Sequence, residues 1–484
     1  MNGAQKIVLL KLGLVIVAAT FGIFAILHNG VFAWFCFIPF FFALQGMGPK
    51  QAAKYGAFAG AIIGVIPALG LSRYGIGVII AISLYAMCYG AIFGAATGLV
   101  GQQTSRYRWI LFLPMVWVSL EFMRTLSPLS LPSNLAISQY ENIPLLQIST
   151  ITGPYGVSFV LVLVNCVLYR MLKAPKMAFA MHNRKFTTFL IVAVTGILFL
   201  PLVYSFHLRS DTLIPKRGGI KVAIVQGSIP IERYRAVNKD YYSKKFIRDR
   251  YFNLTGEAKK SGADLIVWPE GVLAEYAMQE PSLKEKLQAV SQDSGAFFIA
   301  GIPSQSDTGT HNTVYVFSPS GQVIGQYDKI NLVPYFEEYI PGKKSPVINT
   351  ALAQFGVAIC FESIYPRIVR RLTREGAQVL FILTNDAGFG RSKLVDFHAR
   401  EAVFRAVENR RYIVRAAQSG ISMLIDPMGR ILKKTEEFEK TILMGNVWPN
   451  SQDTFYAKYG DVFVYLCILG SVTMCFFKKS GGVK

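Results

Sequence analysis

Charged residues are scarce in this sequence, and their scarcity is local. They make up 16% of the 484 residues, against about a quarter in an ordinary soluble protein. The deficit lies in residues 1–207, which consist mostly of long apolar stretches, whereas residues 209–458 have the mixed composition of a globular domain. A single soluble domain is therefore excluded, and we expect two parts of different character.

Acidic residues are scarcer than basic ones. There are 29 Asp and Glu against 50 Lys and Arg, a net charge of +21. Residues 209–458 contain 34 basic and 26 acidic residues, so most of the excess lies in and around the apolar stretches. Basic residues that flank apolar helices are typical of membrane topology and of contact with anionic lipids. Membrane lipids are therefore expected partners, and nucleic acid is not.

Cysteines are few outside the apolar stretches. Five of the six lie in those stretches, where a cysteine usually acts as a small apolar residue. Residues 209–458 hold only Cys360, so an internal disulfide framework is excluded for that part. No Cys/His spacing indicates a metal site, and we expect neither a metal nor a cofactor.

Apolar segments of near-spanning length predict a membrane α-helical bundle of about eight transmembrane helices. The segment at 31–47 is the weakest, because it is short and Pro39 interrupts it. Glycine and alanine are dense in 56–70 and 90–101, as suits close helix packing in lipid. The eight segments are 7–27, 31–47, 52–71, 76–100, 108–126, 155–173, 187–207 and 461–477.

Lys and Arg are missing from alternate loops. The loops 28–30 and 127–154 have none, whereas basic residues crowd 170–185 and 478–484. Because cytoplasmic loops carry the excess of Lys and Arg, both termini are predicted to be cytoplasmic and the globular part to be exported. The predicted domains are 1–208 with transmembrane helices 1–7, 209–458 as the exported domain, and 459–484 with helix 8 and a cytoplasmic tail.

The exported part alternates short apolar runs of β type with helix-like stretches, which predicts an α/β layer fold. Polar residues follow several of the runs at their carboxyl ends, where active sites of such sheets gather. They are Glu270, Cys360, Glu362, Asn385 and Asp386.

Three of the short stretches together contain the parts of a thiol acyl-transfer site: Val267–Gly271, Tyr327–Ile330 and Ala358–Glu362. A cysteine supplies the nucleophile, a carboxylate moves its proton, and an ammonium stabilises the oxyanion. Each residue also has an ordinary interpretation, as a buried structural cysteine, a turn acid or a surface lysine.

This arrangement resembles the nitrilase superfamily, and the whole chain resembles the bacterial apolipoprotein N-acyltransferases. The resemblance implies an α-β-β-α sandwich for the exported domain. It rests on Trp117–Arg124, Gln226–Ile229, Trp268–Glu270, Tyr327–Pro334, Glu338–Pro341, Cys360–Glu362, Asn385–Gly390 and Arg405–Arg415.

By this resemblance Glu270 is the general base, Lys329 the electrostatic stabiliser and Cys360 the nucleophile. Glu338 and Glu362 match supporting acids around the site. One extra residue in Pro334–Glu338 leaves the choice between Glu337 and Glu338 open, and Gly388 stands where the family often has Trp, so the pocket shape is open too. The residues expected to contact substrate are Tyr335, Phe336, Phe361, Asn385 and Phe389.

The implied reaction transfers an acyl chain from a membrane phospholipid, through a thioester on Cys360, to the α-amine of the N-terminal diacylglyceryl-cysteine of an apolipoprotein. The implied protein is a monomer in the bacterial inner membrane, with its catalytic domain on the periplasmic side. Two other functions fit parts of the pattern. One is a membrane-tethered amidase that hydrolyses a small amide, and the other is an inactive lipid-binding membrane protein.

Overall fold

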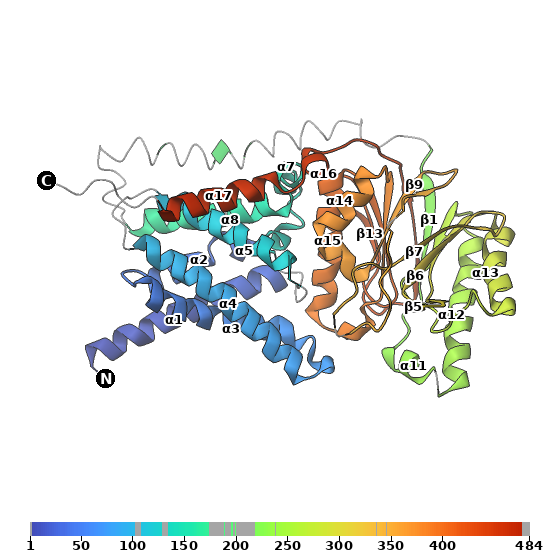
Figure 1. Cartoon of the computed structure of the whole chain (residues 1–484), viewed down its shortest axis with the longest axis horizontal. Coiled ribbons are helices and arrows are strands. Elements are labelled where there is room, and N and C mark those ends of the chain that lie inside the picture. Colours follow the sequence, from blue (N-terminus) through green and yellow to red (C-terminus); the bar gives the residue numbers. More distant parts are fainter. Residues whose placement is uncertain are drawn as a thin grey trace. The chain divides into compact units, whose positions relative to one another are not determined.

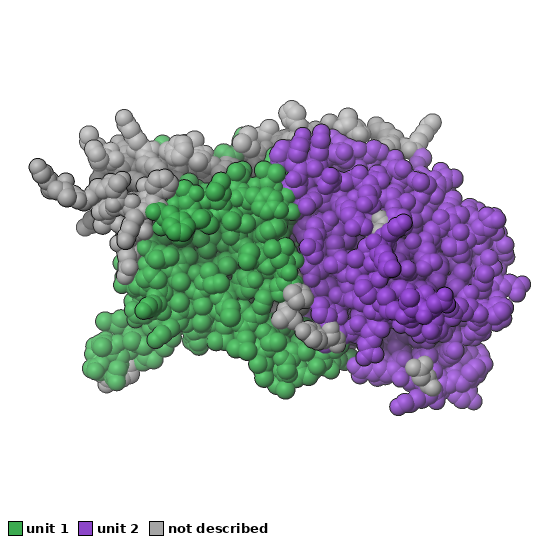
Figure 2. All heavy atoms as spheres, viewed as in Figure 1, with its two compact units in different colours: residues 1–206, 461–484 green, residues 207–460 purple. Residues whose placement is uncertain are grey.

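The computed structural model describes residues 2–101, 108–127, 134–173, 218–237, 239–334, 336–344 and 346–476, with the isolated residues 188, 195, 196 and 199. The chain divides into two compact units, coloured separately in Figure 2. One comprises residues 1–206 and 461–484, and the other comprises residues 207–460.

The first unit is helical (Figure 1). In its described part, three helices are long and apolar enough to cross a membrane, over Gly3–Leu27, Ile76–Val100 and Pro154–Lys173. A membrane part is thus supported, but the predicted count of eight spans is not confirmed. Its elements are α1 (Gly3–Leu27), η1 (Gly30–Trp34), α2 (Phe37–Ala43), α3 (Pro49–Leu69), η2 (Ser72–Tyr74), α4 (Ile76–Gly101), α5 (Arg108–Thr125), η3 (Leu135–Gln139), α6 (Ile143–Leu146), α7 (Ser149–Thr152), α8 (Pro154–Lys173) and α17 (Val462–Phe476).

The predicted segment 31–47 is divided into two short helices, η1 and α2. A break exposes backbone groups that need partners where water is absent. The side chain of Asn165 in α8 supplies a donor and an acceptor for these groups. Its Nδ2 donates to the Ala33 carbonyl at 2.9 Å, and its Oδ1 accepts from the Phe37 N–H at 2.9 Å. The predicted segment 187–207 lies almost wholly outside the described residues.

Helices α3 and α4 approach each other through glycines. A Cβ atom at Gly56 would lie 2.1 Å from the Gly90 carbonyl oxygen, and one at Gly60 would lie 2.3 Å from that of Ala86. The two backbones are therefore in direct contact, as small residues permit between helices in lipid.

The second unit is built on two six-stranded sheets (Figure 1). The first has the order β14-β1-β2-β3-β6-β7 and the second the order β13-β12-β11-β10-β9-β8. Strands β1, β2 and β3 run parallel in one sheet, and β9, β10 and β11 run parallel in the other. The strands of the first sheet are β1 (Ile220–Gln226), β2 (Leu265–Val267), β3 (Phe297–Gly301), β6 (Thr313–Phe317), β7 (Val323–Asp328) and β14 (Thr441–Val447). Those of the second are β8 (Ile348–Asn349), β9 (Gln354–Ile359), β10 (Val379–Thr384), β11 (Tyr412–Ala417), β12 (Met423–Ile425) and β13 (Ile431–Lys434), and β4 (Ser304–Ser306) pairs with β5 (Gly309–His311) as a hairpin.

Side-chain alternation along the strands produces the layers. In β1, Val222 and Ile224 belong to a core shared with strands of the second sheet, whereas Ala223 and Val225 pack in a second core with helices α12 and α13. Two sheets thus meet face to face with helices outside, which confirms the α/β part of the predicted fold. The helices of this unit are α11 (Ile231–Ala236), α12 (Tyr241–Lys259), α13 (Pro281–Ser294), η4 (Cys360–Ile364), α14 (Pro366–Arg374), η5 (Asp386–Phe389), α15 (Lys393–Asn409) and α16 (Phe455–Tyr459).

Candidate active site

Glu270 lies three residues after β2, where β3 ends beside it. A Cβ atom at Gly301 would lie 2.3 Å from the Pro269 carbonyl oxygen, so glycine is needed for this approach. The carboxylate is buried and accepts three hydrogen bonds, from Asn312 Nδ2 at 2.8 Å, Lys329 Nζ at 3.1 Å and the Asn385 N–H at 2.8 Å. The first two donors belong to the first sheet's side of the site and the third follows β10 of the second sheet.

Lys329 directly follows β7 and is completely buried. Its backbone is fixed on both sides, because its N–H donates to the Asn312 carbonyl and its carbonyl accepts from the Gly342 N–H, each at 2.8 Å. Burial alone lowers the pKa of the ammonium, but the nearby carboxylates of Glu270 and Glu337 raise it above its ordinary value. Lys329 therefore stays charged at neutral pH.

The second acid on Lys329 is Glu337. Its Oε1 accepts from Lys329 Nζ at 2.6 Å, and its Oε2 accepts from the Val333 N–H at 3.0 Å. Glu338 is exposed. The choice of Glu338 as the acid beside Lys329 is thus corrected. Glu337, the earlier of the two glutamates, is the one that contacts the lysine.

Cys360 is the first residue of η4, directly after β9, and it has a φ of 50°. A non-glycine residue in this left-handed region is strained by about 1–3 kcal/mol, a feature that clusters at functional sites. Burial and the charge of Glu270 raise the pKa of its thiol well above the ordinary value, while Lys329 and a hydrogen bond with Thr384 lower it less. The Cys360 side chain is therefore a neutral thiol at neutral pH, and a base would be needed to form the thiolate.

Glu362 holds the loop after Lys329 against the start of η4. Its Oε1 accepts from the Tyr327 hydroxyl at 2.6 Å and from the N–H groups of Ile330 and Asn331 at 3.0 Å each. Its Oε2 accepts from the Ile359 N–H at 2.8 Å, one residue before Cys360. Burial raises the pKa of Glu362, and these donors lower it in part. The side chain fixes Lys329 and Cys360 relative to each other.

A buried network on the other side of Cys360 joins Asp386, which the sequence placed at the carboxyl end of a strand, to His398 and Arg415, which were not predicted as site residues. Asp386 Oδ1 faces His398 Nδ1 at 2.9 Å, and Asp386 Oδ2 accepts from Arg415 at 2.9 Å. The His398 Nε2 lies 3.2 Å from the Ser363 hydroxyl and 3.3 Å from the Cys360 carbonyl oxygen. Although burial opposes it, the charges of Arg415 and His398 hold the pKa of Asp386 well below its usual range.

This network contacts Cys360 through its backbone carbonyl. The thiol sulfur, an Asp386 oxygen and a His398 nitrogen lie within 4.8 Å of one another. The sequence signal was Arg415, a charged residue inside the buried strand β11. A buried arginine needs a buried acid, and Asp386 was the acid at the adjacent strand end. The prediction that the site uses neither a metal nor a cofactor stays a prediction.

Comparison with known proteins covers both units. Residues 221–453 match the carbon–nitrogen hydrolase family, and residues 13–167 match the apolipoprotein N-acyltransferase N-terminal domain. The chain is 30% identical over 491 residues to an apolipoprotein N-acyltransferase of Geobacter metallireducens, covering 93% of this chain and 91% of that protein. The chain belongs to the apolipoprotein N-acyltransferase family.

Further members of the apolipoprotein N-acyltransferase family are similar over nearly the same length. The protein of that name from Thermotoga maritima is 25% identical over 495 residues, covering 94% of this chain and 90% of the relative. Among solved structures, the carbon–nitrogen hydrolase of Helicobacter pylori G27 is 18% identical with a TM-score of 0.39, covering 47% of this chain and 88% of that one.

The residues expected to contact substrate in this family member lie in different settings. The Asn385 N–H contacts Glu270, as described, and the Asn385 side chain accepts from the Ala387 N–H at 3.2 Å. The Phe361 ring packs on Tyr365, with centroids 5.3 Å apart, and the Phe389 ring lies 6.1 Å from that of His398. Phe336 is 40% exposed, and Tyr335 lies outside the described residues.

Two adjacent glutamates in this site provide a matched pair of variants. Replacing Glu337 with alanine removes a charged hydrogen-bond partner of Lys329, and a hydrogen bond of this kind contributes about 1.5–3 kcal/mol. Thioester formation is therefore expected to slow by roughly ten- to a hundredfold. Replacing Glu338 with alanine is expected to leave the rate within about twofold, as for exposed positions. Single-turnover acylation measures both rates. Equal losses in the two variants, or a loss only in the second, contradict the assignment.

Proposed function

We propose that this chain is an apolipoprotein N-acyltransferase that works through a Cys360 thioester. The acyl donor is a membrane phospholipid, and the acceptor is the α-amine of the diacylglyceryl-cysteine at the N-terminus of an apolipoprotein. Family membership over nearly the whole length supports the activity. The single structural observation that carries the mechanism is the buried Glu270–Lys329 ion pair, whose charges both act on the pKa of the Cys360 thiol.

In the first half-reaction the Cys360 sulfur attacks the ester carbonyl of the phospholipid while Glu270 takes the thiol proton. Lys329 carries three N–H donors, and Glu270 and Glu337 accept two of them. The remaining donor and the ammonium charge stabilise the tetrahedral oxyanion. The carbon–oxygen ester bond then breaks, the proton on Glu270 passes to the departing alcohol, and a thioester and a lysophospholipid result.

In the second half-reaction the α-amine of the lipoprotein attacks the thioester carbonyl. Glu270 removes a proton from the nitrogen, and the same Lys329 donor stabilises the second oxyanion. The carbon–sulfur bond breaks, the proton returns to the thiolate, and an amide is formed. Both half-reactions use the same groups in the same positions.

A membrane unit suits these substrates. Extracting a phospholipid or a diacylated protein from the bilayer costs about 0.8 kcal/mol for each exposed CH₂ group. An enzyme embedded in the membrane avoids that cost, and helices of spanning length support the embedding. The proposal keeps the residue 209–458 domain on the outer side of the inner membrane and both termini in the cytoplasm.

Labelling of single engineered cysteines with a membrane-impermeant thiol reagent tests this topology in intact cells. Cysteines at Glu141 and Asn142, which are exposed in the basic-free loop, should be labelled, and positions in the basic loop 174–184 should be spared. The reverse pattern contradicts the orientation, because the catalytic unit would then face the cytoplasm.

The activity itself is tested by trapping its intermediate. The full-length protein is incubated with phospholipid carrying a labelled acyl chain, and a protein-bound label that hydroxylamine removes is expected on Cys360. Addition of a diacylglyceryl-cysteine peptide should then move the label to the peptide as a hydroxylamine-resistant amide. Release of free fatty acid with no labelled peptide would instead support a hydrolase.

A further inference from the structure

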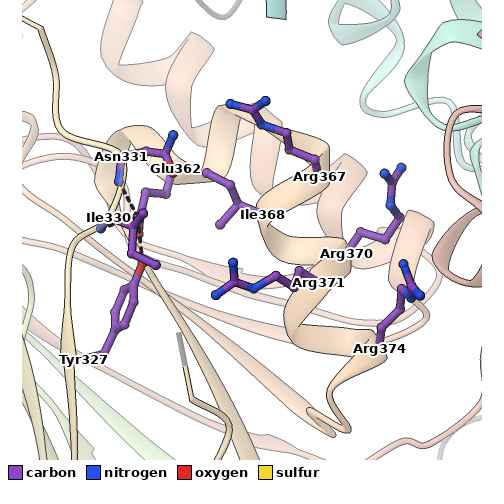
Figure 3. A pocket seen from close by; sticks show the side chains of 9 residues that line it. All are labelled: Tyr327, Ile330, Asn331, Glu362, Arg367, Ile368, Arg370, Arg371 and Arg374. Atoms are coloured by element: carbon purple, nitrogen blue, oxygen red, sulfur yellow. Dashed lines mark hydrogen bonds between the residues drawn. The ribbon is translucent and has the colours of Figure 1, made fainter. Parts of the chain in front are cut away.

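A cavity of about 420 Å³ lies beside Glu362, and four arginines of one helix line it (Figure 3). None of these arginines takes part in the proposed mechanism. We call this space the arginine cavity. Its lining residues are Tyr327, Ile330, Asn331, Glu362, Arg367, Ile368, Arg370, Arg371 and Arg374.

The arginines share one face of α14. They occupy positions i, i+3, i+4 and i+7 of the helix, and such positions lie one above another on its surface. The opposite face carries the buried side chains of Val369 and Leu372. The guanidinium of Arg371 is directed toward Tyr327 and Ile330 (Figure 3), and its charge acts on the Tyr327 hydroxyl. The spacing of the arginines therefore builds one wall of the cavity.

Acidic side chains neutralise this wall only in part. Arg371 pairs with Glu375 at 3.1 Å, and both side chains are about half exposed. Within the described part of the chain, no acidic partner is found for Arg367 or Arg374. The Glu362 carboxylate is already engaged by four donors. The cavity thus has an excess of positive charge.

Guanidinium groups bind phosphate oxygens through paired N–H donors, with planar geometry that suits a phosphate ester. The same cavity includes the apolar side chains of Ile330 and Ile368. A ligand that combines a phosphate with a less polar backbone matches both kinds of surface. A free inorganic anion would use only the arginines.

Glu362 connects the cavity to the segment that carries Cys360. Glu362 lines the cavity, and its Oε2 accepts the N–H of Ile359, the residue before Cys360. The loop that carries Lys329 continues into Ile330 and Asn331, which also line the cavity. A phosphate held by Arg371 therefore lies close to the residues that position the thiol.

We propose that the arginine cavity binds the phosphate of a phosphate ester, and specifically the headgroup phosphate of the phospholipid acyl donor. The source of the phosphate rests on the proposed function, whereas the anion site itself rests on the cavity. Binding there fixes the glycerol backbone of the donor relative to Cys360 before the ester is attacked.

The test uses full-length protein with Cys360→Ala, so that binding is measured without turnover. Its affinity for a short-chain phosphatidylglycerol is compared with its affinity for the matching diacylglycerol, which lacks phosphate. The pair Arg371→Gln and Arg374→Gln is added in one variant. The control variant carries Lys433→Gln and Lys434→Gln on β13. Both lysines are exposed, and replacing them removes the same two positive charges at a place outside the cavity.

The arginine variant should bind the phospholipid about ten- to a hundredfold more weakly, as expected for loss of charged hydrogen bonds. Its affinity for the diacylglycerol and the affinities of the lysine variant should be unchanged. Thermal unfolding checks that both variants remain folded.

Inorganic phosphate separates the two sources. If the arginine variant loses affinity for phosphate but not for phosphatidylglycerol, the cavity takes a free anion and the headgroup assignment is wrong. Equal phospholipid affinity in the arginine and lysine variants, with phosphate binding also unchanged, overturns the anion site itself. Neither result depends on thioester formation, so failure of the cavity proposal is distinct from failure of the proposed enzyme activity.

Discussion

Replacing Cys360 with alanine is expected to abolish both the thioester and the transfer of the acyl chain. Loss of a catalytic nucleophile typically costs on the order of 10⁴- to 10⁶-fold. Alanine at this position keeps the φ of 50° and, with it, the same backbone strain. The fold is therefore expected to be retained, with a thermal unfolding temperature close to that of the parent protein.

The serine variant sharpens this prediction. Serine keeps the size and the hydrogen-bonding capacity of the side chain, but its hydroxyl is a far weaker nucleophile without a thiol's acidity. No hydroxylamine-sensitive adduct is expected on Cys360→Ser either. Acyl transfer near the parent rate by either variant, measured with the same labelled phospholipid, would falsify the assignment of Cys360 as the nucleophile.

Replacing Glu270 with glutamine is expected to change two properties of Cys360 in opposite directions. Acyl transfer should fall by roughly 10²–10⁴-fold, because the thiol loses its base. Simple alkylation of the thiol should become at least about tenfold faster, because the charge that raises its pKa is gone while Lys329 remains. Replacing a glutamate with a purely structural role is not expected to slow acyl transfer and at the same time speed alkylation of the thiol.

The measurement is the rate of iodoacetamide labelling at Cys360, followed by peptide mass spectrometry across pH. In the parent protein the raised pKa keeps the thiolate fraction small at neutral pH, so the labelling rate should still be increasing above pH 9. In the Glu270→Gln variant the same curve should move to lower pH. A plateau near pH 7 in the parent protein contradicts a neutral resting thiol.

The central strands were predictable from the sequence, and the edge strands were not. The strands β1, β3, β9, β10 and β11 are almost entirely buried, so they appear as apolar runs. By contrast β7 and β13 lie at the edges of their sheets and expose most of their side chains, so they show no such run. Edge strands depend on their neighbours for pairing, and that information is absent from local composition.

Glu270 and Cys360 were predictable because each follows an apolar strand, and Lys329 was predictable from the resemblance of its motif to the nitrilase superfamily. Not all of the residues that hold them in place were predictable. The choice between Glu337 and Glu338 depends on the path of a loop with no periodic pattern, and it is the folded loop that brings the Glu337 carboxylate to Lys329. The Asp386–His398–Arg415 network joins three elements far apart in the sequence. The predicted count of eight spans is not confirmed in the described residues for a related reason. Apolar runs of similar composition form a long helix in α1 but a broken pair in η1 and α2.

Because the Glu270 carboxylate accepts hydrogen bonds from both sheets, its position depends on how the two sheets pack against each other. Asn312 and Lys329 approach it from one sheet and the Asn385 N–H from the other. A small slip between the sheets would leave the hydrophobic core largely intact and yet displace the base, and a misplacement of about 1 Å can cost a hundredfold in rate. Activity in this protein is therefore more sensitive than stability to the packing of the two sheets. Substitutions of buried residues between the sheets should greatly reduce activity while the protein remains folded.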